Sequence, residues 1–448
     1  METHSNQKLG YYSLSMIVIG LVIGLGIFRA ASTAANAAIS PTIFFSAWIF
    51  GGVIAICGAL TYAEIGSRYP VTGAYYKIFS EAYHPSVAFA INGIVLVSNA
   101  ASLGGVALIG SDYLSEVVFD QPPTDAIKAL IGIGAIALFY GINLMGLRIS
   151  SKALNILMFI KIGMILLIIS ALFFPSTHVI QQVDIVQADT ISLKSILASF
   201  AACLVAVSFT YGGYQQTINF GEEIHSPNKT ISKSIFTGIL IVIALYLLVN
   251  LSYYKVIGFE ELKSAKGIAA LVAGKLFGPF GKSLFAILLF LAVLAYVDVM
   301  LLSNPRVMYA MSKDGMLPAA FSKKYGKREV LTFGLTAFSL ISMIVIFYAE
   351  TFDRILGFVM ILDSLGMATS AATLFYFRRK TNADSSIEIY KIKFYPWMPL
   401  LFIITYVFVG LACISANPSY GLTSLIVFVA LVLLYFIIRK MGRGEARV

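Results

Sequence analysis

Five ionisable residues lie inside long apolar stretches of this 448-residue chain. Arg29 and Lys161 contribute two positive charges there, and Glu64, Asp298 and Asp363 contribute three negative charges. A charge at membrane depth is costly unless it has a partner or faces a water-filled cavity, so such residues indicate function. One carboxyl group is in excess over the bases. A carboxyl group that can take up a proton at that depth is what proton-coupled transport requires.

We expect either Asp298 or Asp363 to bind a proton during a transport cycle, while the other pairs with Arg29 or Lys161. Alternatively, each acid is hydrogen-bonded to a neighbouring helix or faces a watery vestibule. Glu64 stands near the end of its apolar segment and is expected to be structural. Lys161 lies about eleven residues or more from either end of its segment, too deep to reach the interface by extending its side chain. We therefore interpret Lys161 as functional.

Glycines interrupt two of the apolar segments. The first segment carries Gly20, Gly24 and Gly26, and a later one carries the pair Gly212 and Gly213 followed by polar side chains. A helix that is broken near the middle of a membrane exposes main-chain N–H groups and the positive end of a half-helix, which suit a carboxylate. Such glycines can also simply allow close helix packing. Two of these segments, five spans apart, favour interrupted helices that bind a solute.

Composition shows which elements must position these residues. Only 12% of the residues are charged and 59% are hydrophobic, whereas a soluble domain carries about 25% charged residues. Mean hydropathy is +0.87. A helix needs about 20 apolar residues to cross a bilayer, and the long continuous runs here exclude the alternating strands of a membrane barrel. We predict an all-α membrane protein with twelve helices near residues 11–38, 42–68, 86–112, 124–146, 150–174, 194–221, 231–256, 281–312, 329–349, 354–379, 394–415 and 419–440.

The segments between the predicted helices are too short for a soluble domain, so residues 1–448 are expected to form one membrane domain. The Lys and Arg residues of its loops predict the orientation, because cytoplasmic loops are enriched in them. With both termini in the cytoplasm, 22 of the 32 basic residues lie on the inner side and eight on the outer side. These residues are spread over many loops rather than gathered in a patch, so we do not expect nucleic-acid binding.

Cysteine and histidine usage is sparse. The three cysteines fall in separate apolar segments, and the four histidines form no cluster with them. We therefore expect no disulfide framework, metal or other cofactor. A channel would need repeated carbonyl or charge motifs, and an intramembrane enzyme would need paired acids with a metal or a nucleophile and its base. Neither pattern occurs, so both remain remote alternatives to a secondary transporter.

Four blocks of the sequence carry a family resemblance: GLGIF at 24–28, GALTYAEIGSRYPVTGAYY at 58–76, FTYGGY at 209–214 with EEIHSPNKTI at 222–231, and SNPRVMYAMSKDGMLP at 303–318. They resemble the helix 1, helix 2, helix 6 and helix 8 regions of the amino acid–polyamine–organocation superfamily in its L-amino-acid transporter branch, where the first block reads GSGIF. The resemblance implies a LeuT-like fold of two inverted five-helix repeats, at about 11–174 and 194–379, with helices 1 and 6 broken and two further helices at about 394–440.

The resemblance also implies a substrate site. The carboxylate of an amino acid would bind main-chain groups at Ile23, Gly24, Leu25, Gly26 and Ile27. Its amino group would bind carbonyl groups at Phe209, Tyr211 and Gly212, with the Phe209 ring as a gate over the site and Gln215 as a polar contact. Lys161 aligns with a helix 5 lysine of sodium-independent members, where the ammonium group replaces a sodium ion and ties helix 1 to helix 8.

Three departures from the family pattern bear on the substrate and the coupling. Leu25 replaces a small serine, Arg29 follows Phe28 where an apolar residue is usual, and Asp298 and Asp363 align with neutral polar residues. Neutral L-amino acids rank first as substrates, because the site is mostly apolar. Arg29 leaves an acidic or otherwise anionic substrate open, and a polyamine-type substrate is a further alternative.

The loop at about 112–125 bears on partners. Members of this branch that pair with a heavy chain carry a cysteine there, and this chain has none. We expect a stand-alone permease or exchanger of a bacterial inner membrane, whose partners are an amino acid, the lipid bilayer and, as a hypothesis, protons.

Overall fold

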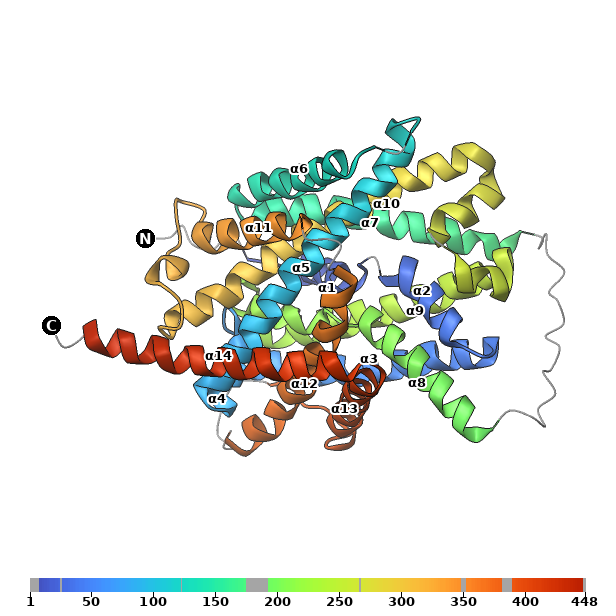
Figure 1. Ribbon diagram of the computed structural model, residues 1–448. Helices are drawn as coiled ribbons and strands as arrows, with labels where there is room; N and C mark the ends of the chain where they lie inside the picture. Colours follow the sequence, from blue (N-terminus) through green and yellow to red (C-terminus); the bar gives the residue numbers. More distant parts are fainter. Residues whose placement is uncertain are drawn as a thin grey trace.

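The computed structural model describes residues 8–24, 26–121, 123–174, 192–265, 267–347, 352–380 and 389–445. Within these ranges, nothing is stated about the side chains of Arg29, 352–359 and 441–445. The described residues form helices and no named strand, and the long helices gather in one bundle (Figure 1). The α-helices are α1 Tyr11–Val22, α2 Gly26–Ala37, α3 Pro41–Arg68, α4 Ala74–Ala82, α5 Pro85–Val118, α6 Asp125–Leu144, α7 Leu147–Ser170, α8 Leu193–Thr210, α9 Pro227–Ser264, α10 Ile268–Lys313, α11 Thr332–Ile346, α12 Phe352–Lys380, α13 Trp397–Ala416 and α14 Pro418–Glu445. Short 3₁₀ helices are η1 Ala171–Phe173, η3 Tyr214–Asn219, η4 Gly221–Glu223 and η5 Ala319–Ser322.

The lengths and compositions of these helices are those of a multi-pass membrane protein. Among the described residues, 10 helices are long and apolar enough to cross a bilayer. The other two predicted spans fall on shorter apolar helices, namely α1, which α2 follows, and α11. Helix α14 lies along the outside of the bundle in Figure 1, and only 11% of its most apolar window is buried. Its exposed leucine and valine side chains suit contact with lipid tails.

Three features of the helices differ from the sequence expectation. The segment around Tyr75 and Tyr76, between the spans predicted at 42–68 and 86–112, forms helix α4, with both rings buried. Helix α9 continues beyond the predicted end through Gly258, and α10 begins before the predicted start and bends at Gly278. Both glycines have positive φ, 77° and 69°, which only glycine adopts readily. These additional turns of α9 and α10 are too polar, or too interrupted by glycine, for the hydropathy of the sequence to predict them as part of a membrane span.

Packing between the helices brings the glycine-rich segments together. Helix α1 packs on α9 and α7, α2 packs on α8 and α9, and α10 packs on α5, α7 and α1. Glu64 joins α3 to α12 at one end of the bundle. Its fully buried carboxylate accepts hydrogen bonds from Arg68 Nε (2.9 Å), Arg378 Nε (2.8 Å) and the Ile392 N–H (2.8 Å). These contacts support the structural role expected for Glu64.

Candidate functional site

The first break lies between α1 and α2. Helix α1 ends at Val22, Ile23 has φ −76° and ψ 80°, and the Gly24 N–H donates to the Val22 carbonyl at 2.8 Å. Helix α2 begins at Gly26, so its first N–H groups have no partner within the helix. Leu25, between the two half-helices, is outside the described residues. This is the expected interruption of helix 1, and it leaves the positive end of α2 at the break.

The second break follows α8. The helix ends at Thr210, and Gly213 has φ 113° before η3 begins at Tyr214. The Gly213 N–H donates to Oε1 of Gln215 at 2.8 Å, so the buried Gln215 side chain stabilises the break itself. The Gly212 N–H donates to the Phe209 carbonyl at 3.3 Å. The expected interruption of helix 6 is therefore also present.

The two breaks touch each other at glycines. A Cβ atom on Gly213 would lie 2.2 Å from the carbonyl oxygen of Leu21, and one on Gly26 would lie 3.1 Å from Cγ2 of Thr210. Only glycine permits the first approach, and its positive φ would strain any other residue. Main-chain groups of α1, α2 and α8 are thus held side by side.

Tyr246 of α9 joins the two breaks through one hydroxyl group. That hydroxyl lies 3.1 Å from the carbonyl oxygen of Val22 and 3.3 Å from that of Thr210, and it donates to both. The ring is fully buried, and it packs against the rings of Tyr211 and Trp48. The sequence reasoning missed Tyr246. The sequence offered one indication of this residue, a tyrosine within the apolar run 235–249.

Lys161 of α7 reaches the first break. Its side chain is fully buried, and Nζ donates to the Ile23 carbonyl at 2.6 Å. The ammonium group therefore binds a carbonyl that the interruption of helix 1 has freed. Within the described residues no ion pair joins Lys161 to Asp298 or Asp363, and the expected pairing of one acid with Arg29 or Lys161 stays a prediction. The other expected partner, Arg29, has no described side chain.

The two aspartates have different surroundings. Asp298 of α10 is fully buried, and its Oδ1 accepts hydrogen bonds from Asn143 and Ser150, each at 2.7 Å. Asp363 of α12 is only partly buried, and within the described residues no hydrogen bond or ion pair reaches it. It interacts electrostatically with the hydroxyl groups of Tyr75, Tyr296 and Tyr406.

Tyr296 connects the Asp363 region with the first break. A Cβ atom on Gly24 would lie 3.5 Å from the Tyr296 ring, and the Tyr296 hydroxyl is hydrogen-bonded to Ser102 of α5 at 2.9 Å. Neither Tyr296 nor Ser102 was predicted from the sequence. The remaining predicted site residues differ in exposure: Ile27 and Tyr211 are buried, whereas the Phe209 side chain is 42% exposed.

Comparison with known proteins assigns the chain to a family. The amino acid permease family is matched over residues 9–438. The chain belongs to the amino acid permease family. This confirms the superfamily that the four sequence blocks indicated. The chain with the twelve expected spans and the two broken helices is therefore a permease, and its family transports amino acids.

Relatives of the permease include proteins with different substrates. It is 24% identical over 435 residues to the serine/threonine exchanger SteT of Bacillus subtilis, covering 95% of this chain and 96% of that one. It is 26% identical over 414 residues to the human cystine/glutamate transporter, covering 90% and 79%. It is 26% identical over 368 residues to the rat large neutral amino acids transporter small subunit 2, covering 79% and 67%. All three are transporters or exchangers, so the family's activity is transport and not catalysis.

Proposed function

We propose that the permease carries an amino acid whose two charged groups bind the two helix breaks. The carboxylate would bind the N–H groups at residues 24–26 and the positive end of α2, and the ammonium group would bind carbonyls of Phe209, Tyr211 and Gly212. The observation that supports this proposal is the contact of the two breaks at Gly213 and Leu21. A zwitterion needs hydrogen-bond donors for its carboxylate and acceptors for its ammonium group. A site made of main-chain groups can bind any L-amino acid, whatever its side chain.

Neutral L-amino acids are the proposed substrates. Tyr296 and the Gly24 face border the site, and both offer apolar or weakly polar surface. Relatives named for serine and threonine and for large neutral amino acids support this class. Counterflow uptake into proteoliposomes tests the proposal. Vesicles preloaded with an unlabelled amino acid should accumulate the labelled one, and failure with all twenty would refute the transport site.

Transport is proposed to be independent of sodium. Lys161 Nζ, at 2.6 Å from the Ile23 carbonyl, supplies a fixed positive charge where a cation would otherwise be needed. Replacing external sodium by choline should leave counterflow unchanged. Lys161→Met should reduce it by about 10-fold or more, since a hydrogen bond to a charged group contributes about 1.5–3 kcal/mol. Sodium-stimulated uptake by the unmodified protein would contradict this part of the proposal.

A cationic substrate of the polyamine type is the second candidate. It is favoured over an anionic substrate by Asp363, which is partly accessible and has no cationic partner among the described residues. Competition separates the candidates: inhibition of leucine counterflow by putrescine or lysine, and not by glutamate, would support the cationic reading. Strong inhibition by glutamate would favour the anionic alternative that Arg29 leaves open.

The architecture is proposed to be the LeuT-like inverted repeat, with both termini cytoplasmic in a bacterial inner membrane. The breaks five spans apart support the repeat, and the excess of basic residues on one side supports the orientation. The permease is proposed to work without a heavy chain. Counterflow by the purified single chain tests this directly.

A further inference from the structure

A buried carboxyl group joins three helices away from the helix breaks. Asp298 of α10 accepts hydrogen bonds at Oδ1 from Asn143 Nδ2 of α6 and from Ser150 Oγ of α7, both at 2.7 Å. Ser150 Oγ also lies 3.0 Å from Oδ1 of Asn143. Two donors on one oxygen orient the carboxyl group and favour its negatively charged form.

The other oxygen of Asp298 has no partner. Oδ2 is buried and receives no hydrogen bond within the described part of the chain. An ionised carboxyl group in such surroundings is costly without a cation. Asn143 and Ser150, the groups that face it from α6 and α7, are uncharged, and Tyr296 on its own helix bonds Ser102. Within the described residues, no positively charged group therefore balances the ionised Asp298 carboxylate.

The nearby basic residues are engaged elsewhere. Lys161, further along α7, bonds the Ile23 carbonyl. Arg306, two turns along α10, pairs with Glu223 at 2.6 Å. The guanidinium of Arg328 donates to the Met145 carbonyl at 2.8 Å. No ion pair within the described ranges links any of them to Asp298, so a proton from outside the protein can neutralise its carboxylate.

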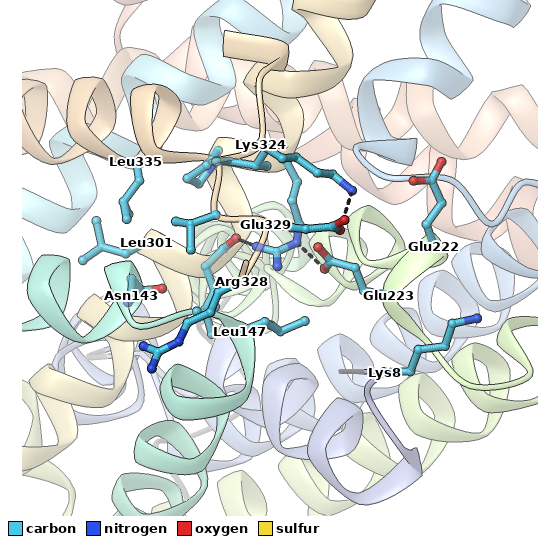
Figure 2. A pocket seen from close by; sticks show the side chains of 16 residues that line it. Lys8, Asn143, Leu147, Glu222, Glu223, Leu301, Lys324, Arg328, Glu329 and Leu335 are labelled. Carbon is cyan, nitrogen blue, oxygen red and sulfur yellow. Dashed lines mark hydrogen bonds and ion pairs between the residues drawn. The ribbon is translucent and has the colours of Figure 1, made fainter. Parts of the chain in front are cut away.

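A cavity leads toward this carboxyl group. Its volume is about 390 Å³, and its wall includes Asn143 and Leu147, with Leu301 and Leu302 from the turn of α10 that follows Asp298. Figure 2 shows Asn143, Leu301 and Leu335 on one side of the cavity and Lys8, Glu222 and Glu223 on the other. Asn143 both lines the cavity and bonds Asp298, so this side chain links the cavity wall to the carboxyl group. By the proposed orientation this cavity opens to the cytoplasm.

We propose that Asp298 is the proton-binding site of the permease, reached from this cavity past Asn143, with Asn143 and Ser150 as positioning residues. A proton from cavity water binds Oδ2 of the carboxylate and gives the neutral acid, and its release restores the carboxylate. Protonation weakens the two hydrogen bonds at Oδ1, because a neutral acceptor holds them less strongly than a charged one. The proton thereby loosens the junction of α6, α7 and α10. The inference rests on the proposed transport of amino acids.

Asp298→Asn tests the proton site, because the amide keeps the shape and cannot titrate. Proteoliposomes are prepared with the unmodified protein and the variant, using labelled L-leucine or L-serine, whichever the unmodified protein exchanges. An imposed inward proton gradient should raise uptake by the unmodified protein and acidify internal pyranine. Asp298→Asn should lose both effects while keeping counterflow, which needs no net proton movement. Gradient-driven uptake that survives in Asp298→Asn overturns the proposal.

Ser150→Ala tests the same idea with the carboxyl group in place. Removing one donor to the carboxylate makes the proton harder to remove, so the pH profile of gradient-driven uptake should move by about one unit to higher pH. Ser151→Ala is the matched control, because Ser151 is the next residue and its buried hydroxyl has no hydrogen-bond partner in the part of the chain that the structure describes. Identical profiles for Ser150→Ala and the unmodified protein would refute a positioning role and leave only a structural clamp.

The result for the unmodified protein separates this inference from the proposed function. Counterflow without any response to the proton gradient would overturn Asp298 as a coupling site and leave amino acid transport intact. Absence of counterflow with every amino acid would instead overturn the proposed function on which the inference rests.

Discussion

Removal of the Tyr246 hydroxyl should weaken substrate binding measurably. The hydroxyl lies 3.1 Å from the Val22 carbonyl oxygen and 3.3 Å from the Thr210 carbonyl oxygen. The Val22 carbonyl keeps another donor, the Gly24 N–H at 2.8 Å. Tyr246→Phe therefore loses a hydrogen bond worth about 1 kcal/mol and leaves the Thr210 carbonyl poorly satisfied, for a total of about 1–2 kcal/mol. If binding requires the breaks in this arrangement, affinity falls by about 5–30-fold.

The assay is equilibrium binding of the labelled substrate to purified protein, with a thermal unfolding scan of the same samples. Tyr253→Phe is the matched control. Tyr253 lies on the same helix α9 with its ring fully buried, and its hydroxyl has no hydrogen-bond partner among the described residues. The control should bind like the unmodified protein. Affinity unchanged in Tyr246→Phe, or reduced equally in Tyr253→Phe, would refute the reasoning that one hydroxyl holds the two breaks together.

Two further substitutions test the packing around the site. Gly213→Ala should abolish counterflow, because its Cβ would lie 2.2 Å from the Leu21 carbonyl oxygen, whereas Gly163→Ala, with no atom within 4 Å of the added Cβ, should transport normally. Equal transport by both variants would contradict close contact of the breaks. Glu64→Gln should destabilise the protein by about 3–5 kcal/mol, seen as a lower melting temperature, because it leaves Arg68 and Arg378, whose side chains are 7% and 20% exposed, without their buried carboxylate partner. Glu81→Gln, at an exposed pair, should have little effect, and a similar loss in both would refute the burial argument.

Helices and breaks were predictable because they depend on neighbouring residues. Hydropathy over about 20 residues located the spans, and the glycines at 24, 26, 212 and 213 located the interruptions. Helix α4 was missed, since nine residues with mixed polarity carry no span signal. Interruptions at Gly258 and Gly278 were missed for a related reason. Single glycines near the ends of apolar runs do not distinguish a bend from a loop.

Only the main-chain part of the candidate site could be predicted from the sequence. Family motifs named the residues of both breaks and Lys161, and the structure brings these residues together. Side-chain partners could not be read from the chain, because each depends on which helices become neighbours. Gln215 was expected to contact substrate, yet its oxygen binds the Gly213 N–H. One of the two aspartates was expected to pair with Arg29 or Lys161, and the Lys161 ammonium group is bound to a main-chain carbonyl.

The sequence by itself determined that this chain is a helical membrane protein of the amino acid permease family, with two helices weakened at glycines. The family follows from the resemblance of four sequence blocks. The spans and their weak points follow from local composition, since each segment's transfer into lipid and each glycine's backbone freedom depend on few neighbours. Only the tertiary structure decided the polar contacts. Asp298 meets partners 148 and 155 residues away, and Tyr246 reaches a carbonyl 224 residues away. Helix packing sets such distances, and hydrogen bonds form only where packing brings a donor within about 3 Å of an acceptor.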